Sequence, residues 1–257
     1  MGGLTVLAAL RRELPDESFV YLGDTARLPY GTKSPSTVRR YAQQAALSLL
    51  EHDVKALVVA CNTASGIALA DLAERFAPVP VFGVVEPGAR AAAAAARGGS
   101  VFVAATESTI AGGAYQRALS QADARVSVYG RACPLWVTLA EQGIAADPAL
   151  TRAVLESGLR GMRASGARTL LLGCTHFPVF AESLAEILGP DVTIVDSAAT
   201  TANAVASRLA ELALVRRGEG DVEAKTIFCA TDGVERFRRV GRDFLGASIS
   251  EVELVDL

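Results

Sequence analysis

The amino-acid sequence predicts an α/β fold made of two pseudo-symmetric α/β domains, with mainly parallel sheets and an active site in the cleft between them. Short apolar runs alternate with helix-like segments over the whole chain, which is the pattern of such folds. The runs are rich in valine and leucine, as in strands that are buried on both faces. One run that ends in cysteine occurs twice. Because parallel sheets bind ligands at the carboxyl ends of their strands, the repeated run indicates where a site lies.

The individual elements follow from hydrophobic periodicity and turn signals. Helix 36–51 is the clearest, because apolar residues recur at helical spacing from Val38 to Leu49 and Ser34-Pro35 is a start signal. The alanine run 91–96 is predicted to be helical, and residues 97–100 to turn into the next strand. Strands are predicted at residues 19–22, 56–60, 79–85, 101–105, 126–129, 169–173, 192–195 and 226–230.

The internal repeat relates residues 57–63 to residues 170–176. The first segment reads LVVACNT and the second LLLGCTH, so each has three aliphatic residues, a small residue, a cysteine and two polar residues. The two cysteines, Cys61 and Cys174, are separated by about the length of one small α/β unit. We therefore expect residues 1–88 plus 198–257 to form the Cys61 domain and residues 89–197 the Cys174 domain, each bringing one thiol to a shared cleft.

Composition excludes several classes of protein. The chain has 257 residues, of which 51% are hydrophobic and 21% charged, enough apolar material for a folded core. Mean hydropathy is high at +0.30, yet no apolar run approaches the ~20 residues of a membrane-spanning helix. The net charge is −3 and no basic stripe is visible, so neither nucleic acid nor a membrane is an expected partner. Without a signal segment at the start, the expected compartment is the cytoplasm.

Two cysteines at strand ends suggest chemistry, and each also has a purely structural interpretation. Cys61 precedes a helix start, where N–H groups and the helix dipole favour a thiolate and can hold a carboxylate. Alternatively, it packs at the strand end as a small apolar residue. Cys174 is followed two residues later by His176, which can reach the thiol or a ligand. Cys133 and Cys229 have no acid or base beside them and are interpreted as structural.

Two facing thiols favour racemisation over hydrolysis. A thiol hydrolase would pair Cys174 with His176 but gives no role to a second, matching cysteine. Racemisation removes a proton from one face of a carbon and returns one to the other face, so it needs two acid/base groups. The sequence has no phosphate-binding loop, dinucleotide fingerprint or metal-binding histidine pair, so no cofactor and no metal are expected.

The motifs resemble those of the glutamate racemase family, within the aspartate/glutamate racemase superfamily, in family order over nearly the whole chain. The resemblance implies cofactor-independent interconversion of L- and D-glutamate, which supplies D-glutamate for peptidoglycan, and usually a homodimer. The two cysteine motifs with the Pro-Tyr-Gly loop are typical of the glutamate-type members. The matching segments are residues 2–6, 23–27, 29–31, 60–64, 86–89, 106–110, 132–135 and 173–178.

The resemblance also implies roles for individual residues. Cys61 and Cys174 are the two acid/base groups. His176 assists Cys174, and Glu141 matches the acidic residue near that side of the site; its other interpretation is a solvated acid at a helix end. Thr106 and Thr109 are weaker matches. The residues expected to bind glutamate are Tyr30, Gly31, Asn62, Thr63, Thr106, Thr109, Thr175 and His176.

One departure from the family concerns the start of the chain. The family begins with a strand that ends in Asp-Ser-Gly, whose aspartate assists the first thiol and whose serine contacts substrate. Here Met1-Gly2-Gly3 leads directly into a helix pattern over residues 4–14. We expect the true start to lie upstream; a chain beginning at Met1 would have weak or no turnover and an unpaired sheet edge. The alternatives left open are racemisation of another acidic amino acid and a ligand-binding member with weakened catalysis.

Overall fold

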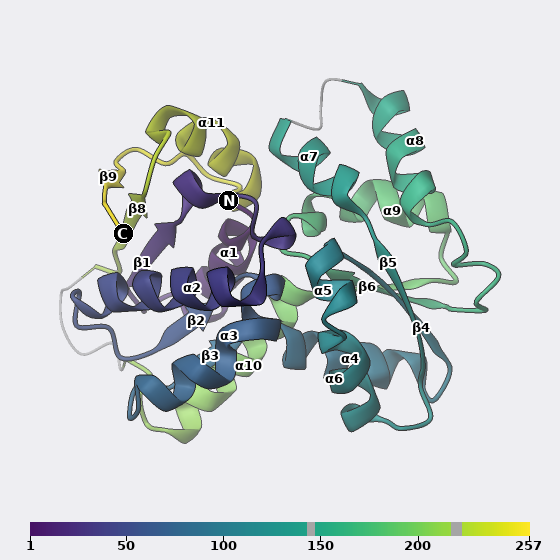
Figure 1. Ribbon diagram of the computed structural model, residues 1–257, viewed down its shortest axis with the longest axis horizontal. Helices are drawn as coiled ribbons and strands as arrows, with labels where there is room; N and C mark the ends of the chain where they lie inside the picture. Colours follow the sequence, from purple (N-terminus) through teal and green to yellow (C-terminus); the bar gives the residue numbers. More distant parts are fainter. Residues whose placement is uncertain (143–146, 217–222) are drawn as a thin grey trace.

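The computed structural model describes residues 1–142, 147–216 and 223–257, which form two α/β halves side by side (Figure 1). One half contains strands β1–β3 with β8 and β9, and the other contains β4–β7. Every strand pair among the described residues is parallel. The predicted α/β fold with parallel sheets is confirmed.

The first half has two small sheets. β1 (Phe19–Gly23) pairs with β8 (Thr226–Ala230), which pairs with β9 (Glu253–Leu254). β2 (Leu57–Val59) pairs with β3 (Val81–Gly83). Within the described residues, β1 and β2 each have a strand partner on one side only. The carboxyl ends of both strands lead into polar segments, which begin at Asp24 and Asn62.

Five helices surround these sheets. They are α1 (Gly3–Glu13), α2 (Pro35–Leu50), α3 (Asn62–Arg75), α10 (Ser197–Glu211) and α11 (Val234–Leu245). The start of α2 is fixed by Ser34, whose Oγ accepts a hydrogen bond from the Thr37 N–H, and by proline at the first helical position. Asp196 caps α10 in the same way, through the N–H groups of Ala198 and Ala199. α1 and α10 pack together through a shared apolar cluster that includes Val6.

The second half is a four-stranded sheet in the order β5-β4-β6-β7, comprising β4 (Ser100–Ala105), β5 (Ser127–Ala132), β6 (Thr169–Gly173) and β7 (Thr193–Asp196). Alternate residues of β4 face opposite sides, because strand side chains have a period of two. Val101 and Val103 pack with α4 (Val85–Ala96) and α6 (Ala114–Ala122). Phe102 and Ala104 face α7 (Pro134–Gln142) and α8 (Pro148–Gly158).

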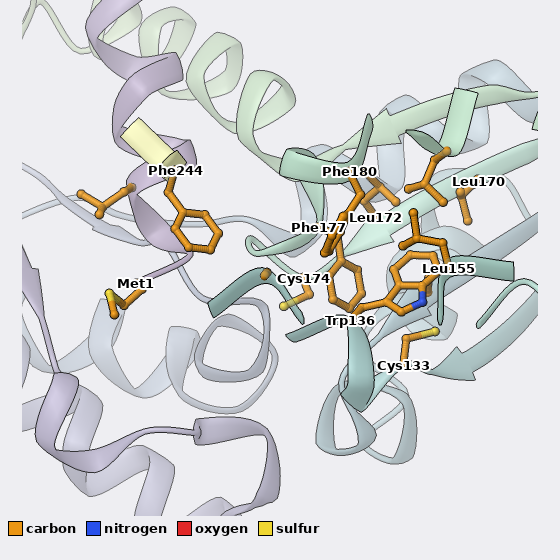
Figure 2. Packing of buried hydrophobic residues seen from close by; sticks show 14 of the residues in the cluster. Met1, Cys133, Trp136, Leu155, Leu170, Leu172, Cys174, Phe177, Phe180 and Phe244 are labelled. Carbon is orange, nitrogen blue, oxygen red and sulfur yellow. The ribbon is translucent and has the colours of Figure 1, made fainter. Parts of the chain in front are cut away.

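An aromatic cluster fixes the segment that follows β6 (Figure 2). The ring of Trp136 meets the ring of Phe177 edge-on with centroids 4.9 Å apart, and its Nε1–H donates to the Val154 carbonyl at 3.1 Å. Phe180, just before α9 (Ala181–Leu188), packs on the same indole. These residues are fully buried, so the backbone on either side of Cys174 is held by core packing.

All eight predicted strands are present, and two of them have an end that differs from the prediction by two or more residues. The predicted strand 79–85 is shorter because Val84 is already helical and α4 starts at Val85. The strand predicted at 126–129 runs on to Ala132 because it pairs with β4 along its whole length. β9 was not predicted, since two residues give no periodic signal. None of the described helices has the length and apolar character that crossing a membrane requires.

Candidate functional site

A cavity of about 620 Å³ lies between the two halves and is lined by both predicted acid/base cysteines. Its polar part is built at the carboxyl ends of β1, β2 and β6 and at the amino ends of the helices that follow. An apolar extension runs beneath α2 and α3, past Ala42, Leu49 and Leu72. A cavity of this size, mostly apolar with a few convergent polar groups, is typical of small-molecule sites.

Cys61 occupies the N-cap position of α3, directly after β2 and Ala60. The N–H groups of Thr63 and Ala64 and the Thr63 hydroxyl face its sulfur. Burial raises the pKa of the Cys61 thiol, and these donors oppose that rise because they stabilise the thiolate. The predicted combination of a thiol with a helix amino terminus is therefore present.

Cys174 follows β6 and is 6% exposed. Burial raises the pKa of this thiol to about 12, although the His176 N–H, which faces the sulfur, favours the thiolate. A negative charge on Cys61 raises the pKa of Cys174 further, because the two sulfurs share one poorly solvated space. Simultaneous ionisation of both thiols is therefore disfavoured.

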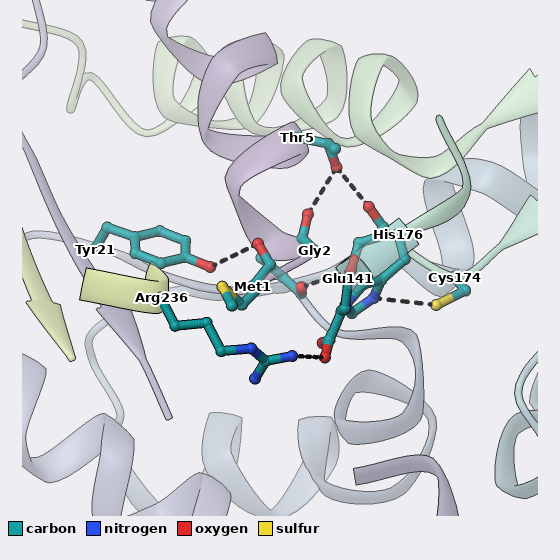
Figure 3. Close-up of polar contacts among 10 residues, drawn as sticks. Met1, Gly2, Thr5, Tyr21, Glu141, Cys174, His176 and Arg236 are labelled. Carbon is teal, nitrogen blue, oxygen red and sulfur yellow. Dashed lines mark hydrogen bonds and ion pairs between the residues drawn. The ribbon is translucent and has the colours of Figure 1, made fainter. Parts of the chain in front are cut away.

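A chain of polar contacts leads away from Cys174 (Figure 3). Its sulfur lies 3.6 Å from Nδ1 of His176, and Nε2 of His176 lies 3.0 Å from Oε1 of Glu141. The other carboxylate oxygen of Glu141 accepts a hydrogen bond from the Arg236 guanidinium at 2.8 Å. Glu141 is thus partly buried and paired, and the interpretation as a solvated helix-end acid is wrong.

Burial acts in opposite directions on Glu141 and His176, yet the pKa of each group is lowered. Burial alone would raise the pKa of Glu141, but the contact with His176 above all, then the nearby amino terminus and the hydrogen bond from Arg236, lower it to about 2. Burial lowers the pKa of His176, and the neighbouring carboxylate only partly offsets this effect. A neutral imidazole that donates its Nε2–H to Glu141 has its Nδ1 lone pair on the side of the Cys174 thiol. His176 can therefore accept the proton of Cys174.

Three threonine hydroxyls form a cluster between α3 and α5 (Glu107–Ala111). Oγ1 of Thr63 lies 3.0 Å from that of Thr106 and 3.2 Å from that of Thr109, and the latter two are 2.9 Å apart. Thr63 and Thr106 line the cavity, whereas Thr109 does not line it and stands behind them. The structure thus gives Thr109 a supporting position in place of the expected place on the wall.

The loop after β1 forms another wall through two short 3-10 turns, η1 (Thr25–Arg27) and η2 (Tyr30–Thr32). The Tyr30 hydroxyl donates to the carboxylate of Asp24, which the Arg27 side chain also holds at 2.8 Å. Gly31 is required by a close approach, since a Cβ there would lie 2.8 Å from Cβ of Thr106. Tyr30 and Gly31 both line the cavity, as expected.

Asn62 and Thr175 join the two halves at the cavity wall. Nδ2 of Asn62 donates to the Tyr115 hydroxyl at 2.6 Å, while its buried Oδ1 has no protein partner in the described part of the chain. The Thr175 hydroxyl donates to the Ala60 carbonyl at 3.3 Å. The Thr5 hydroxyl donates to the Thr175 carbonyl at 2.9 Å. An unpaired buried oxygen beside the cavity is suited to a ligand N–H.

Sequence reasoning gave no role to Asp24, although it lies in the matching segment 23–27, and missed Tyr115 and Arg236, which lie in no motif. All three contact site residues through the fold. Cys133 and Cys229 are buried and do not line the cavity. In residues 1–142, 147–216 and 223–257, no three His, Cys, Asp or Glu side chains are grouped as metal ligands. The predicted site residues that line the cavity are Tyr30, Gly31, Cys61, Asn62, Thr63, Thr106, Glu141, Cys174, Thr175 and His176.

Comparison with known proteins gives consistent results. Residues 4–205 match the family model described as Asp/Glu/Hydantoin racemase. The glutamate racemase of Geobacter metallireducens is 45% identical over 257 residues, and the match covers the whole chain and 94% of that relative.

Solved structures share the fold over the whole chain. A glutamate racemase isoform from Bacillus anthracis superposes with a TM-score of 0.93 at 36% identity, covering the whole chain and 94% of that structure. The glutamate racemase of Francisella tularensis in complex with D-glutamate superposes with a TM-score of 0.91 at 33% identity, again covering the whole chain and 94% of that structure.

Proposed function

Because the chain belongs to the glutamate racemases of the Asp/Glu/Hydantoin racemase family, we propose that it interconverts L- and D-glutamate with Cys61 and Cys174 as the two acid/base groups. The observation that carries the proposal is the placement of two thiols, each at a strand end of a different half, on one cavity. Glutamate is the proposed substrate because a structurally similar relative was crystallised with D-glutamate.

The proposed reaction needs no group outside the chain and the substrate. One cysteine, as thiolate, takes the α-proton of glutamate and becomes a thiol, and the electron pair of the broken C–H bond stays on the α-carbon. The other cysteine, as thiol, gives its proton to the opposite face and becomes a thiolate. The C–H bond is replaced with inversion, and the two sulfurs exchange protonation states. The reverse reaction starts from that exchanged state.

The two thiols are activated differently. Cys61 is assisted by the N–H groups of Thr63 and Ala64 and by the Thr63 hydroxyl, which stabilise negative charge on its sulfur. Cys174 can pass its proton to Nδ1 of His176, and the carboxylate of Glu141 stabilises the resulting imidazolium. The α-ammonium of glutamate lowers the pKa of both thiols, because a nearby positive charge favours the thiolate. The bound substrate thus helps to create the base that attacks it.

The remaining site residues are proposed to bind the substrate. The amino end of α3 and the backbone of Tyr30 and Gly31 supply N–H groups for its carboxylates. The unpaired Oδ1 of Asn62 accepts from its ammonium. Thr63, Thr106, Thr175 and His176 line the same wall, and Thr109 acts through the first two.

Further proposals concern the setting of this reaction. The enzyme uses no cofactor, works in the cytoplasm and supplies D-glutamate for peptidoglycan. Residues 1–88 plus 198–257 and residues 89–197 form its two domains, in keeping with the separate sheets of the two halves. The protein acts as a homodimer, which light scattering coupled to size-exclusion chromatography tests: a monomeric mass at micromolar concentration contradicts it.

The deciding experiment incubates each enantiomer of glutamate with the protein in deuterated water. The proposal expects inversion with deuterium at the α-carbon, and loss of racemisation in both Cys61→Ser and Cys174→Ser. Cys133→Ser, a matched control outside the cavity, retains activity. A hydrolase would need only Cys174, a binding protein would show no exchange, and inversion of L-aspartate in preference to L-glutamate would indicate another substrate. Each of these three outcomes contradicts the proposal.

A further inference from the structure

Arg236 reaches the site from a helix that contributes no other residue to the proposed reaction. It lies on α11, which packs with β1 and β8, whereas Glu141 lies on α7 of the other half. Nη2 of Arg236 is 2.8 Å from Oε2 of Glu141, and the two residues are 95 positions apart in the chain. The same helix places Phe244 edge-on against the His176 ring, with centroids 5.3 Å apart. Thus α11 contacts both residues that serve Cys174.

Glu141 is in an unfavourable place without a cation. It sits in the last turn of α7, which ends at Gln142, and the carboxyl end of a helix carries partial negative charge. His176 contributes a neutral ring, because burial lowers its pKa. The Glu141 side chain is 15% exposed, so water solvates its carboxylate poorly. The Arg236 guanidinium is therefore the cationic side chain that the structure places in contact with this carboxylate.

The two oxygens of Glu141 have different partners. Oε1 accepts from His176 and Oε2 accepts from Arg236, so the carboxylate is held at two points (Figure 3). Holding Oε2 keeps Oε1 directed at Nε2, which in turn keeps Nδ1 of His176 directed at Cys174. Without Arg236 the carboxylate can rotate and take up water, and the imidazole loses the partner that fixes its tautomer and orientation.

We propose that Arg236 is a positioning residue for the racemase reaction, acting on Cys174 through Glu141 and His176. The inference rests on the proposed function, because it gives Arg236 a role in that same proton transfer. In this role α11, a helix of one half, orients the acid/base group Cys174 of the other half. The role is specific to the Cys174 face of the substrate, since Cys61 has its own donors from α3.

The test compares Arg236→Gln, Arg236→Lys and the control Arg239→Gln, an exposed arginine on the same helix outside the cavity lining. Wild-type racemisation of glutamate is measured first, so failure of the proposed function is seen separately. Arg236→Gln is expected to lower kcat about tenfold with a KM change below about threefold, because an oriented acid/base group is weakened while substrate contacts stay. Arg236→Lys recovers most of the loss, and Arg239→Gln matches wild type.

Isotope exchange distinguishes positioning from general damage. In Arg236→Gln, the enantiomer whose α-proton is removed by Cys61 loses that proton at the normal rate. Its inversion is slowed, because Cys174 has to deliver the new proton. The ratio of deuterium incorporation to inversion therefore rises in Arg236→Gln for one enantiomer only. A structural defect lowers both processes for both enantiomers. Thermal unfolding of each variant shows whether the fold is kept, and if Arg236→Gln does not fold, Arg236→Ala takes its place in the same comparison.

A double-mutant cycle gives the final check. If Arg236 acts through Glu141, Arg236→Gln has no further effect on kcat in a Glu141→Gln background. Independent, multiplicative losses would overturn the proposal. So would activity of Arg236→Gln within twofold of wild type, an equal loss in Arg239→Gln, or an isotope ratio that stays the same for both enantiomers.

Discussion

Nε2 of His176 lies 3.0 Å from Oε1 of Glu141, a contact that ties the segment after β6 to the last turn of α7. Both side chains are largely buried, at 13% and 15% exposed. The contact determines which nitrogen of His176 is available to Cys174, and it also couples the fold to pH because the pKa values of both groups are lowered.

Acid should weaken the fold through Glu141. Its pKa is about 2 in the folded protein and 4.5 as the ordinary value, so its contribution is present above pH 4.5 and is lost as pH falls toward 2. The lowered pKa of His176 acts in the same direction below pH 6.5, because the unfolded chain binds that proton more readily. Glu141→Gln should reduce the free energy of unfolding by on the order of 2–3 kcal/mol at pH 7 and by much less at pH 3.

Urea unfolding at pH 7, 5 and 3 measures this difference. The exposed Glu182 on α9 provides the control, since Glu182→Gln changes the same charge without removing a buried contact. A difference between wild type and Glu141→Gln that stays constant from pH 7 to pH 3 contradicts the linkage.

Thr109 should matter for substrate affinity although it does not line the cavity. Thr109→Val removes the hydroxyl that bonds to Thr63 and Thr106 but keeps the side-chain shape. We expect KM for glutamate to rise about threefold to tenfold, because one lost neutral hydrogen bond corresponds to roughly 1 kcal/mol. Steady-state kinetics measure the effect, and Thr109→Ser, which keeps the hydroxyl, should remain close to wild type. Equal KM values for the valine and serine variants would show that the hydroxyl is unimportant.

Gly31 should not tolerate a side chain. The Cβ of Gly31→Ala would lie 2.8 Å from Cβ of Thr106, so the Tyr30-Gly31 loop has to move away from α5. A shift of about 1 Å at a substrate-binding wall can lower activity on the order of 10²-fold, and we expect kcat/KM to fall at least about tenfold. Ser36→Ala, at the exposed start of α2, is the matched control. Unchanged kinetics for Gly31→Ala would mean that the loop adapts without cost.

Gly158 should be required by the packing of the only tryptophan. A Cβ at this position would lie 2.5 Å from Nε1 of Trp136, whose N–H donates to Val154. Gly158→Ala is expected to reduce the free energy of unfolding by about 2 kcal/mol, as overpacked cores do. Tryptophan emission during urea unfolding reports both the stability and the burial of the ring. Glu156→Ala, which removes only an exposed ion pair with Arg152, should stay within about 0.5 kcal/mol of wild type.

Local sequence patterns predicted most of the fold and part of the candidate site. The period of apolar residues located every strand longer than two residues, and the repeated cysteine segment located the two thiols, because these features depend on neighbouring positions. Arg236 could not be found this way, since its contact with Glu141 exists only when the two halves come together. The same is true of Tyr115, which meets Asn62 across 53 positions. The position of Thr109 behind the wall depends on how α5 packs against α3, which no sequence period records.

The burial that raises the pKa of both thiols also governs their chemistry toward other reagents. Peroxides and alkylating agents react with the ionised sulfur, which an empty cavity hardly contains at neutral pH. In the proposed reaction the ionised form arises when an amino acid fills the cavity, and that amino acid would block the approach of such reagents. We therefore expect an enzyme that depends on two cysteines to resist oxidative inactivation both without substrate and with it.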